Sequence, residues 1–264
     1  MLIMEIAVAD FEAVKLANGK SLIHNISIAT GNLRHTKKWH SRGRGNSPVF
    51  SNKVMCTDGP RIDIRIKNSL KNPAIELSEN IHNKLRLTSD NAVMYNFEEI
   101  EVSTLREALR LMLLFVNTFT DGILVSHALD RDLEFLFDTA DVLGEKKIFK
   151  KDFLYRPEVG CYLPGWNKLT LVCSQRLLTT LCPKFDKDVS LSQPDTRLSS
   201  YSRYVFGPDY VQTHTSVGDA HDLYKVLCRA YEMDKFQIDL GKSRLFMKPR
   251  SIHNRGCTSS SFLQ

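Results

Sequence analysis

The chain has 264 residues, of which 42% are apolar and 25% are charged, a composition that supports a buried core and excludes wholesale disorder, collagen-like repeats and a disulfide-dense miniprotein. The net charge is +6, and the excess comes from residues 34–44 and 240–264, which each hold five basic residues and no acidic one. Without these two windows the chain is net −4, so the distribution of charge favours a polyanionic partner.

The N-terminal part of the chain predicts strands. Two apolar runs rich in β-branched residues, 2–9 and 22–29, flank the dipeptide Asn18-Gly19 and predict adjacent strands joined by a turn. Residues 60–67 place isoleucines at alternate positions with charged groups between them, which predicts a half-buried strand. The segment 31–59 is rich in Gly, Ser, Asn and basic residues, and it predicts a long loop or a poorly ordered hairpin.

The rest of the chain predicts mainly helices. Thr104 and Glu107 form a capping-box pattern that opens a helix over 104–118. Residues 122–126 predict a short buried strand, and a helix follows with its inward positions at Leu133, Leu136, Phe137, Ala140 and Leu143. Two more amphipathic helices are predicted over 168–181 and 217–233. This order of elements is typical of an α/β fold with a mixed sheet.

Three groups of polar residues stand at the predicted element ends. Asp10 and Glu12 are two apart at the end of a strand, so their carboxylates share a face and favour a divalent cation, although two solvated acids at a strand end are the alternative. Asp132 follows a buried strand at the start of a helix, where it could also be a helix cap. His214 and Asp219 open the last helix and combine a base with a carboxylate, or else a surface His with a cap.

In this order and spacing the three groups resemble the DEDDh family of 3′→5′ exonucleases, the RNase T-like or DnaQ-like group. Asp10 and Glu12 match its DxE motif, Asp132 its second motif, and His214 with Asp219 its third. Asp132 is preferred to Asp130 because relatives with a His at this strand end carry the ligand five positions later, as Asp132 follows His127. The resemblance covers about residues 4–233 and implies an RNase H-like fold with a central mixed five-stranded sheet flanked by helices.

The resemblance also implies a mechanism. The four carboxylates would hold two Mg²⁺ or Mn²⁺ ions at a 3′-terminal phosphodiester, and His214 would take the proton from the attacking water. The products would be nucleoside 5′-monophosphates. Two departures from the family are visible: Ala-Val-Lys follows Glu12 where Thr-Thr-Gly is common, and the third motif lies further from the second than in compact members.

Nucleic-acid contacts are predicted mainly in the first basic window. Its basic residues alternate with aromatic ones, a composition suited to phosphate contact and base stacking, with a solvated surface loop as the alternative. The predicted contacts are Arg34, Lys37, Lys38, Trp39, Arg42 and Arg44, together with Phe11 and His127 from the first two motifs. The expected partners are single-stranded 3′ ends or duplex termini of RNA or DNA, within a possible larger replication or RNA-processing complex.

We expect one exonuclease domain over 1–240, with the basic loop at 31–59 and an insert at 144–210 between the second and third motifs. Residues 241–264 predict a basic, mobile tail. The runner-up hypothesis is a catalytically inactive nucleic-acid-binding or scaffold module on the same fold. The motifs address a phosphodiester, so they leave open RNA or DNA, single or paired strands, the oligomeric state and the biological process.

The cysteines predict free thiols. Cys161, Cys173 and Cys182 fall in the insert, where some viral relatives bind zinc, but they lack the close pairs of a structural zinc site. Cys173 falls on the apolar face of the helix predicted over 168–181, which favours a core thiol. With six Cys, no CxxC, no basic signal-peptide start and no apolar run longer than 111–116, we expect a reducing intracellular location and no membrane contact.

A second resemblance concerns the third motif and the end of the chain. The run from His214 to Ala220 and the final Phe262-Leu263-Gln264 resemble the proofreading exoribonucleases of nidoviruses, which would imply a viral origin and a host-cytoplasmic location. Those enzymes normally have Glu in the second motif and recognisable zinc fingers. This chain has Asp132 there, and its cysteine spacing does not predict a zinc finger.

Overall fold

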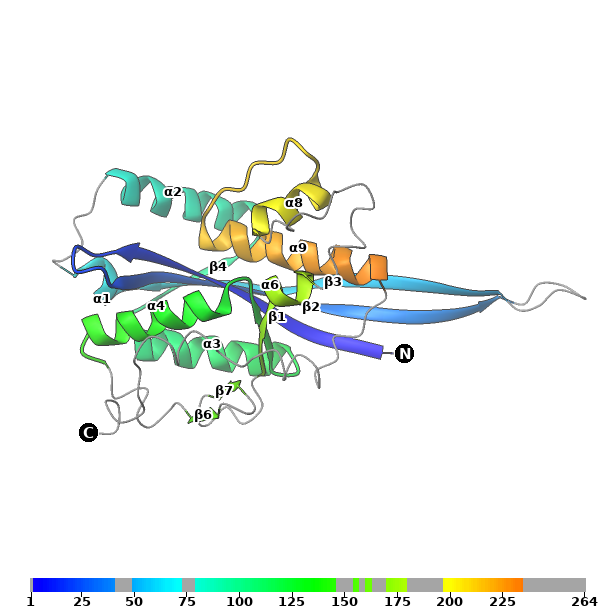
Figure 1. Cartoon of the computed structure of the whole chain (residues 1–264), viewed down its shortest axis with the longest axis horizontal. Helices are drawn as coiled ribbons and strands as arrows, with labels where there is room; N and C mark the ends of the chain where they lie inside the picture. The colour runs from blue at the N-terminus through cyan, green and yellow to red at the C-terminus, as the bar shows by residue number, and fades with distance from the viewer. Residues whose placement is uncertain are drawn as a thin grey trace, which may run out of the picture.

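The computed structural model describes the α/β body of the chain (Figure 1), namely residues 2–40, 49–72, 79–145, 154–156, 160–162, 170–179 and 197–234. Within these ranges a six-stranded mixed sheet carries helices on both faces. The α/β class predicted from the sequence is confirmed, and the sheet has one strand more than the five expected. The extra strand is β4 (Glu98–Val102), in which only Ile100 and Val102 are apolar, too short an alternation to predict a strand.

The strand order is β4-β3-β2-β1-β5-β8. Beside β4, the strands are β1 (Leu2–Lys15), β2 (Ser21–His40), β3 (Val49–Ile66), β5 (Ile123–Ser126) and β8 (Thr170–Cys173). β2 is antiparallel to both of its neighbours, whereas β1, β5 and β8 are parallel to one another and β4 is parallel to β3. Among the described strands of this sheet, β2 alone is therefore reversed.

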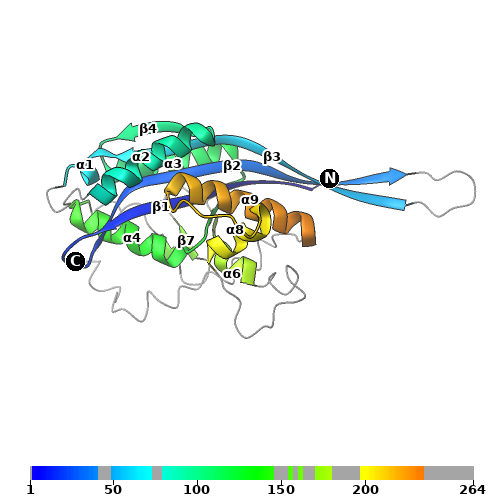
Figure 2. The same cartoon turned by 90° about the horizontal axis from the view of Figure 1, so that it is seen from above.

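Helices cover the sheet on both sides. The side chains of β1 alternate, so that Ala7 and Ala9 pack on α3 (Leu105–Phe119) and α4 (Leu129–Val142). Ile6 and Val8 pack on the opposite face with α2 (Glu79–Met94), α8 (Leu198–Phe206) and α9 (Ser216–Asp234). Figures 1 and 2 show the two helical layers on either side of the sheet. The short helices α1 (Lys67–Leu70) and α6 (Ser174–Thr179) follow β3 and β8, and β6 (Leu154–Arg156) pairs with β7 (Gly160–Tyr162) in a separate small sheet.

The segment predicted as a loop or hairpin over 31–59 forms the outer parts of two strands. Residues 31–40 continue β2 and residues 49–58 begin β3, paired from Gly31 with Asp58 to His40 with Val49. We call these two stretches the ribbon, and it projects from the body of the sheet (Figure 2). The loop interpretation was wrong for these residues because the Gly and Ser content is concentrated in 41–48, outside the described residues, whereas 49–57 is rich in strand-forming residues.

The root of the ribbon is fixed by a close approach of α9. A Cβ atom built on Gly31 would lie 2.0 Å from the hydroxyl of Tyr224, so only glycine leaves room for this ring. The buried Tyr224 donates its hydroxyl hydrogen to the carbonyl of Thr57, at 2.9 Å. One helix is thereby packed against both strands at the point where the ribbon leaves the sheet.

Most other element predictions are confirmed, with shifted ends. The helices expected over 104–118 and 217–233 correspond to α3 and α9, and the capping box of Thr104 and Glu107 is present. The helix expected over 168–181 was wrong in its first half, because Thr170–Cys173 pairs with β5 as strand β8 before α6 begins. Short runs such as this one fit a strand or a buried helix equally well until a pairing partner is known.

Candidate functional site

The candidate site lies at the carboxyl edge of the parallel strands. Ala9, Ser126 and Cys173 are in register on β1, β5 and β8, and β5 and β8 end at this level. In open α/β sheets, ligand sites form outside the carboxyl ends of the strands. Asp10 follows Ala9, and both α4 and α9 begin beside the same edge, so three segments distant in sequence bring the predicted residues to it.

A row of polar residues crosses the α9 face of the sheet at this level, and its two middle members, Ser27 and Asp63, are buried. The register places Glu99, Asp63, Ser27 and Asp10 side by side on four neighbouring strands. Ser27 Oγ donates to Asp63 Oδ1 at 2.6 Å and lies 2.8 Å from Oγ of Ser216, the first residue of α9. The start of α9 is thereby tied to the sheet next to Asp10.

Asp63 is the most buried acid of this row. Its carboxylate also accepts a hydrogen bond from Asn25 at 2.9 Å and lies 3.5 Å from Nε of Arg65. Burial raises the pKa of Asp63, while the hydrogen bonds from Ser27 and Asn25 and the charge of Arg65 act in the opposite direction. A buried carboxyl with several donors stabilises the fold only while those donors are in place, because an unsatisfied buried polar group costs about 1–3 kcal/mol.

Asp10 and Glu12 share one face of β1, as predicted. Both side chains are half-buried and have the same parity as Ile6 and Val8, which places them on the α9 face. Phe11 points to the other face and is buried in the core formed with α3 and α4, so its side chain lies away from the two carboxylates.

Asp132 reaches the edge from the opposite side of the sheet. It lies in the first turn of α4, where the N-cap is Ala128 and no side chain caps the helix, so neither Asp130 nor Asp132 is a cap. The buried Asp132 carboxyl accepts a hydrogen bond from Ser126 at the end of β5. Burial raises the pKa of Asp132 to about 7, although the Ser126 hydrogen bond and the charge of Arg131 oppose this shift. Asp130 is only half-buried.

His214 and Asp219 flank the start of α9. His214 is exposed and has a φ of 53°, a left-handed conformation that is uncommon for residues other than glycine. The helix is capped by Thr215, whose Oγ1 accepts from Gly218 N at 3.1 Å and from Asn91 Nδ2 at 2.9 Å. Neither His214 nor Asp219 is therefore the cap of this helix. Asp219 is half-buried one turn into α9.

His127 lies directly after β5 and is held by neighbours. Its Nδ1 is 3.0 Å from Oγ of Ser174, and its ring meets Tyr201 of α8 edge-on, with ring centroids 6.2 Å apart. These contacts link the ends of β5 and β8 to the helical layer. His127 is half-buried, so part of its side chain remains accessible beside the edge.

The predicted ligands come to one edge but are not assembled there as a metal site. Within the residues that the structure describes, no three His, Cys, Asp or Glu side chains are grouped so that they could hold a metal ion. The donor chemistry, all carboxylates, suits Mg²⁺ or Mn²⁺. The arrangement of the carboxylates does not suit these ions. Asp10 and Glu12 lie on the α9 face, whereas Asp132 approaches from the α4 side and is engaged with Ser126.

The sequence analysis did not identify the polar row around Asp63. Ile62, Ile64 and Ile66 are buried as predicted, but the charged residues Arg61 and Asp63 on the other face of the strand are buried as well. A signal was present, since Asn25 and Ser27 alternate with isoleucines on the neighbouring strand. Two adjacent strands with polar residues at alternate positions can form an internal polar row.

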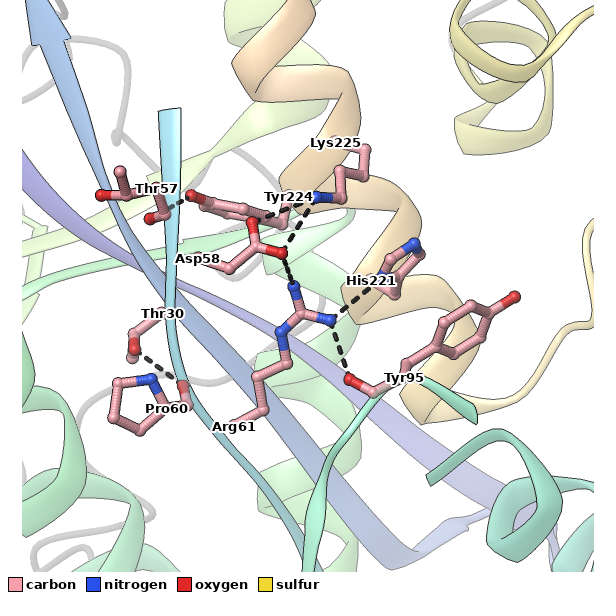
Figure 3. A network of polar contacts seen from close by, with 9 residues as sticks. All are labelled: Thr30, Thr57, Asp58, Pro60, Arg61, Tyr95, His221, Tyr224 and Lys225. Atoms are coloured by element: carbon pink, nitrogen blue, oxygen red, sulfur yellow. Dashed lines mark hydrogen bonds and ion pairs between the residues drawn. The ribbon is translucent and has the colours of Figure 1, made fainter. Parts of the chain in front are cut away.

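A second polar cluster surrounds Arg61 beside α9 and was also missed (Figure 3). Arg61 is buried, donates from Nη1 to the carbonyl of Tyr95 at 2.9 Å, and lies 3.2 Å from Nδ1 of His221. Its Nη2 donates to Asp58 at 2.6 Å, and Lys225 donates to the same carboxylate at 3.0 Å. Burial and the charge of Arg61 lower the pKa of His221 to about 4, so the ring is neutral and accepts from Arg61.

Part of the predicted nucleic-acid surface is described. Arg34 is half-buried on β2, and Lys37, Lys38 and Trp39 lie further along the same strand in the ribbon. Arg42 and Arg44 lie outside the described residues, as do most of the predicted insert and the whole tail over 241–264.

The cysteine prediction needs one correction. Cys173 does not lie on a helix, because it ends strand β8, where it is half-buried and its thiol lies 3.6 Å from the carbonyl of His127. Cys161 belongs to β7, and Cys182 lies outside the described residues.

Searches against known proteins identify no relative: no protein-family model matches the chain, and no curated protein does. Among the helices that the structure describes, none combines the length and the apolar character needed to cross a membrane.

Proposed function

We propose that this protein is a 3′→5′ exonuclease that acts at the carboxyl edge of its sheet. The observation that carries the proposal is the strand order β3-β2-β1-β5-β8 with β2 reversed. An RNase H-like fold has this arrangement, with three antiparallel strands followed by two parallel to the first. The additional strand β4 extends the sheet at the far side from β5 and leaves the order of the other five unchanged.

The positions of the three motifs support the same proposal. In an exonuclease of this kind the DxE motif lies on the first strand and the other two motifs open the helices beside it. Here Asp10 and Glu12 lie on β1, Asp132 lies in the first turn of α4, and Asp219 lies in the first turn of α9. His214 is exposed just before α9, where its ring would take a proton from an attacking water.

The proposal includes Mg²⁺ or Mn²⁺ as the cofactor, because all four predicted ligands are carboxylates. Binding would require Asp132 to ionise and to leave its hydrogen bond with Ser126, since the carboxylates are not gathered as a ligand set in this structure. The substrate would be the 3′ end of RNA or DNA. The basic residues of the ribbon would contact its phosphates, and a larger replication or RNA-processing assembly would be a natural setting.

A catalytically inactive nucleic-acid-binding module on the same fold is the second candidate. The position of Asp132 favours it, because this buried carboxyl is engaged with Ser126 on the side of the sheet opposite to Asp10 and Glu12. Such a module would bind nucleic acid through the ribbon and would leave the 3′ end intact. Cleavage and binding must therefore be measured separately.

A time course with 5′-labelled and 3′-labelled oligonucleotides in Mg²⁺ tests the proposal. We expect a ladder that shortens from the 3′ end and stops in excess chelator. Asp10→Ala, Glu12→Ala, Asp132→Asn and Asp219→Ala should each lower the rate at least about 100-fold, and His214→Ala should lower it severely. Asp121→Ala changes an exposed acid in the turn before β5 and should leave the rate unchanged.

The same experiment distinguishes the two candidates. RNA and DNA, each single-stranded and paired, are supplied in parallel to identify the substrate. Oligonucleotide binding without any cleavage by the wild type would support the inactive module, and cleavage that persists in Asp10→Ala or in chelator would contradict the exonuclease proposal. If Asp130→Ala is inactive while Asp132→Asn retains activity, the second-motif assignment is wrong.

A further inference from the structure

Two cysteines meet where α9 packs on the root of the ribbon. Cys56 lies on β3 and Cys228 on α9, 172 residues apart in sequence, and Sγ of Cys56 is 3.9 Å from the carbonyl oxygen of Cys228. The two side chains also influence each other's ionisation. Cys56 is half-buried and Cys228 is buried, and both are free thiols. The chain therefore holds an accessible thiol in contact with an enclosed one.

Two contacts in the neighbouring turn of α9 keep the two thiols together. Tyr224 lies one turn before Cys228 and donates to the carbonyl of Thr57, the residue after Cys56. Lys225 donates to the carboxylate of Asp58 from the same turn of the helix, at 3.0 Å. Because folding already fixes α9 against β3 next to the pair, joining the two sulfurs requires little further ordering of the chain.

The surroundings make the two thiols chemically different. The hydrogen bond from Cys228 lowers the pKa of the Cys56 thiol, and the positive charge of Lys225 acts in the same direction, against burial and the charges of Glu232 and Asp58. The hydrogen bond to Cys56 and burial raise the pKa of Cys228. An accessible thiol with a lowered pKa is the usual nucleophile in disulfide exchange, and an enclosed partner resolves the mixed disulfide.

We propose that Cys56 and Cys228 form a reversible disulfide that joins the root of the ribbon to α9, with a small-molecule disulfide such as glutathione disulfide as the oxidant. The Cys56 thiolate attacks one sulfur of the oxidant and releases one glutathione thiolate, which takes up a proton. Cys228 then loses its proton to solvent and attacks the Cys56 sulfur of the mixed disulfide, forming the Sγ–Sγ bond and releasing the second glutathione. Two protein thiols are oxidised, and one glutathione disulfide is reduced to two glutathione molecules.

The test incubates the native full-length protein with mixtures of reduced and oxidised glutathione, quenches with acid, and alkylates the remaining thiols. Mass spectrometry of the unreduced peptides should show one cross-link between the peptides that carry Cys56 and Cys228, lost on treatment with dithiothreitol. The oxidised protein should also melt roughly 5–10 °C higher, because the cross-link closes a long loop of the unfolded chain.

Three variants make the result specific. Cys56→Ser and Cys228→Ala should each abolish the cross-link and the rise in Tm, and Cys228→Ala should leave a glutathione adduct at Cys56. Cys173→Ser removes another half-buried free thiol and should change neither readout. The proposal is overturned if native wild-type protein gives only glutathione adducts at Cys56, or if the cross-link forms only after denaturation. Neither outcome depends on nuclease activity.

Discussion

His221 and Asp222 are neighbours on α9 whose pKa values are shifted in opposite directions. Burial raises the pKa of Asp222 to about 6, although its carboxylate accepts hydrogen bonds from Tyr210 at 2.8 Å and from Ser202 at 3.3 Å. Burial and Arg61 lower the pKa of His221 to about 4. Compared with the unfolded chain, the folded protein binds the proton of Asp222 more tightly. It binds the proton of His221 less tightly.

The two groups make opposite contributions to the pH dependence of the free energy of unfolding, and replacing Asp222 should reveal the contribution of His221. As the pH falls from 7 to 4, protonation of Asp222 stabilises the fold by about 2 kcal/mol, whereas protonation of His221 in the unfolded chain destabilises it. Asp222→Asn keeps an acceptor for Tyr210 but removes the stabilising contribution. We expect urea unfolding of this variant to show an additional loss of about 2 kcal/mol between pH 7 and pH 4 compared with the wild type. A difference between the two proteins that does not change with pH would refute this explanation.

At the residue scale, the sequence predicts which polar residues share a face of a strand better than it predicts how deeply they are buried. The spacing of Asp10 and Glu12 correctly predicted that the two share a face of β1. The burial of Asp63 could not be predicted from alternation on β3, because it depends on helices that arrive from distant parts of the chain. The separation of Asp132 from the Asp10 face likewise depends on the side of the sheet that α4 covers.

At the scale of elements, α3 offers a clean test of a locally encoded helix start. Thr104 accepts a hydrogen bond from Glu107 N at 3.2 Å, and the Glu107 carboxylate accepts from Thr104 N at 3.2 Å. Thr104→Ala removes the hydrogen bond between the Thr104 hydroxyl and the amide of Glu107. It should lower the free energy of unfolding by about 1 kcal/mol. Chemical denaturation measures the loss.

Thr118 provides the matched control on the same helix. It is exposed, and its hydroxyl donates to the carbonyl of Leu114 in the last turn, whereas the hydroxyl of Thr104 accepts from a backbone amide at the helix start. Thr118→Ala should change the free energy of unfolding by less than about 0.5 kcal/mol. Equal losses for the two variants would mean that the capping box of α3 does not stabilise the protein.

The predictability of the elements follows from whether their signals are local. The capping box and the apolar spacing of α3 lie within the helix, so its start and end were predicted to within a residue. β8 and the ribbon are held by strands elsewhere in the chain, and their own residues do not identify the partner. Local patterns therefore predicted helices well and misjudged segments whose structure comes from pairing.

At the scale of the whole molecule, the basic window 34–44 begins on the outer part of β2, whereas the chain without its two basic windows is net −4. If Lys37, Lys38, Arg42 and Arg44 contact phosphates, replacing all four with Gln should weaken oligonucleotide binding. It should also reduce the slope of log K against log salt by about 3, since each phosphate contact contributes about 0.7–0.9. Binding titrations at several salt concentrations measure this slope.

The control makes the same change of charge on the body of the protein. Four exposed arginines serve for this purpose, namely Arg86, Arg110, Arg203 and Arg229. Their replacement by Gln should alter the slope much less than the ribbon variant does. If both variants reduce the slope equally, net charge rather than the ribbon governs binding.

The continuity of β2 and β3 has a mechanical consequence. Ser27 and Asp63 of the polar row lie on the same two strands as the outermost ribbon pair, His40 and Val49, roughly 40 Å away at about 3.3 Å per residue. The ribbon strands are thus continuous with the strands of the polar row, and Tyr224 packs against Gly31 at the point between the two. A ligand that displaces the outer end of the ribbon would therefore shift the same two strands that carry Ser27 and Asp63.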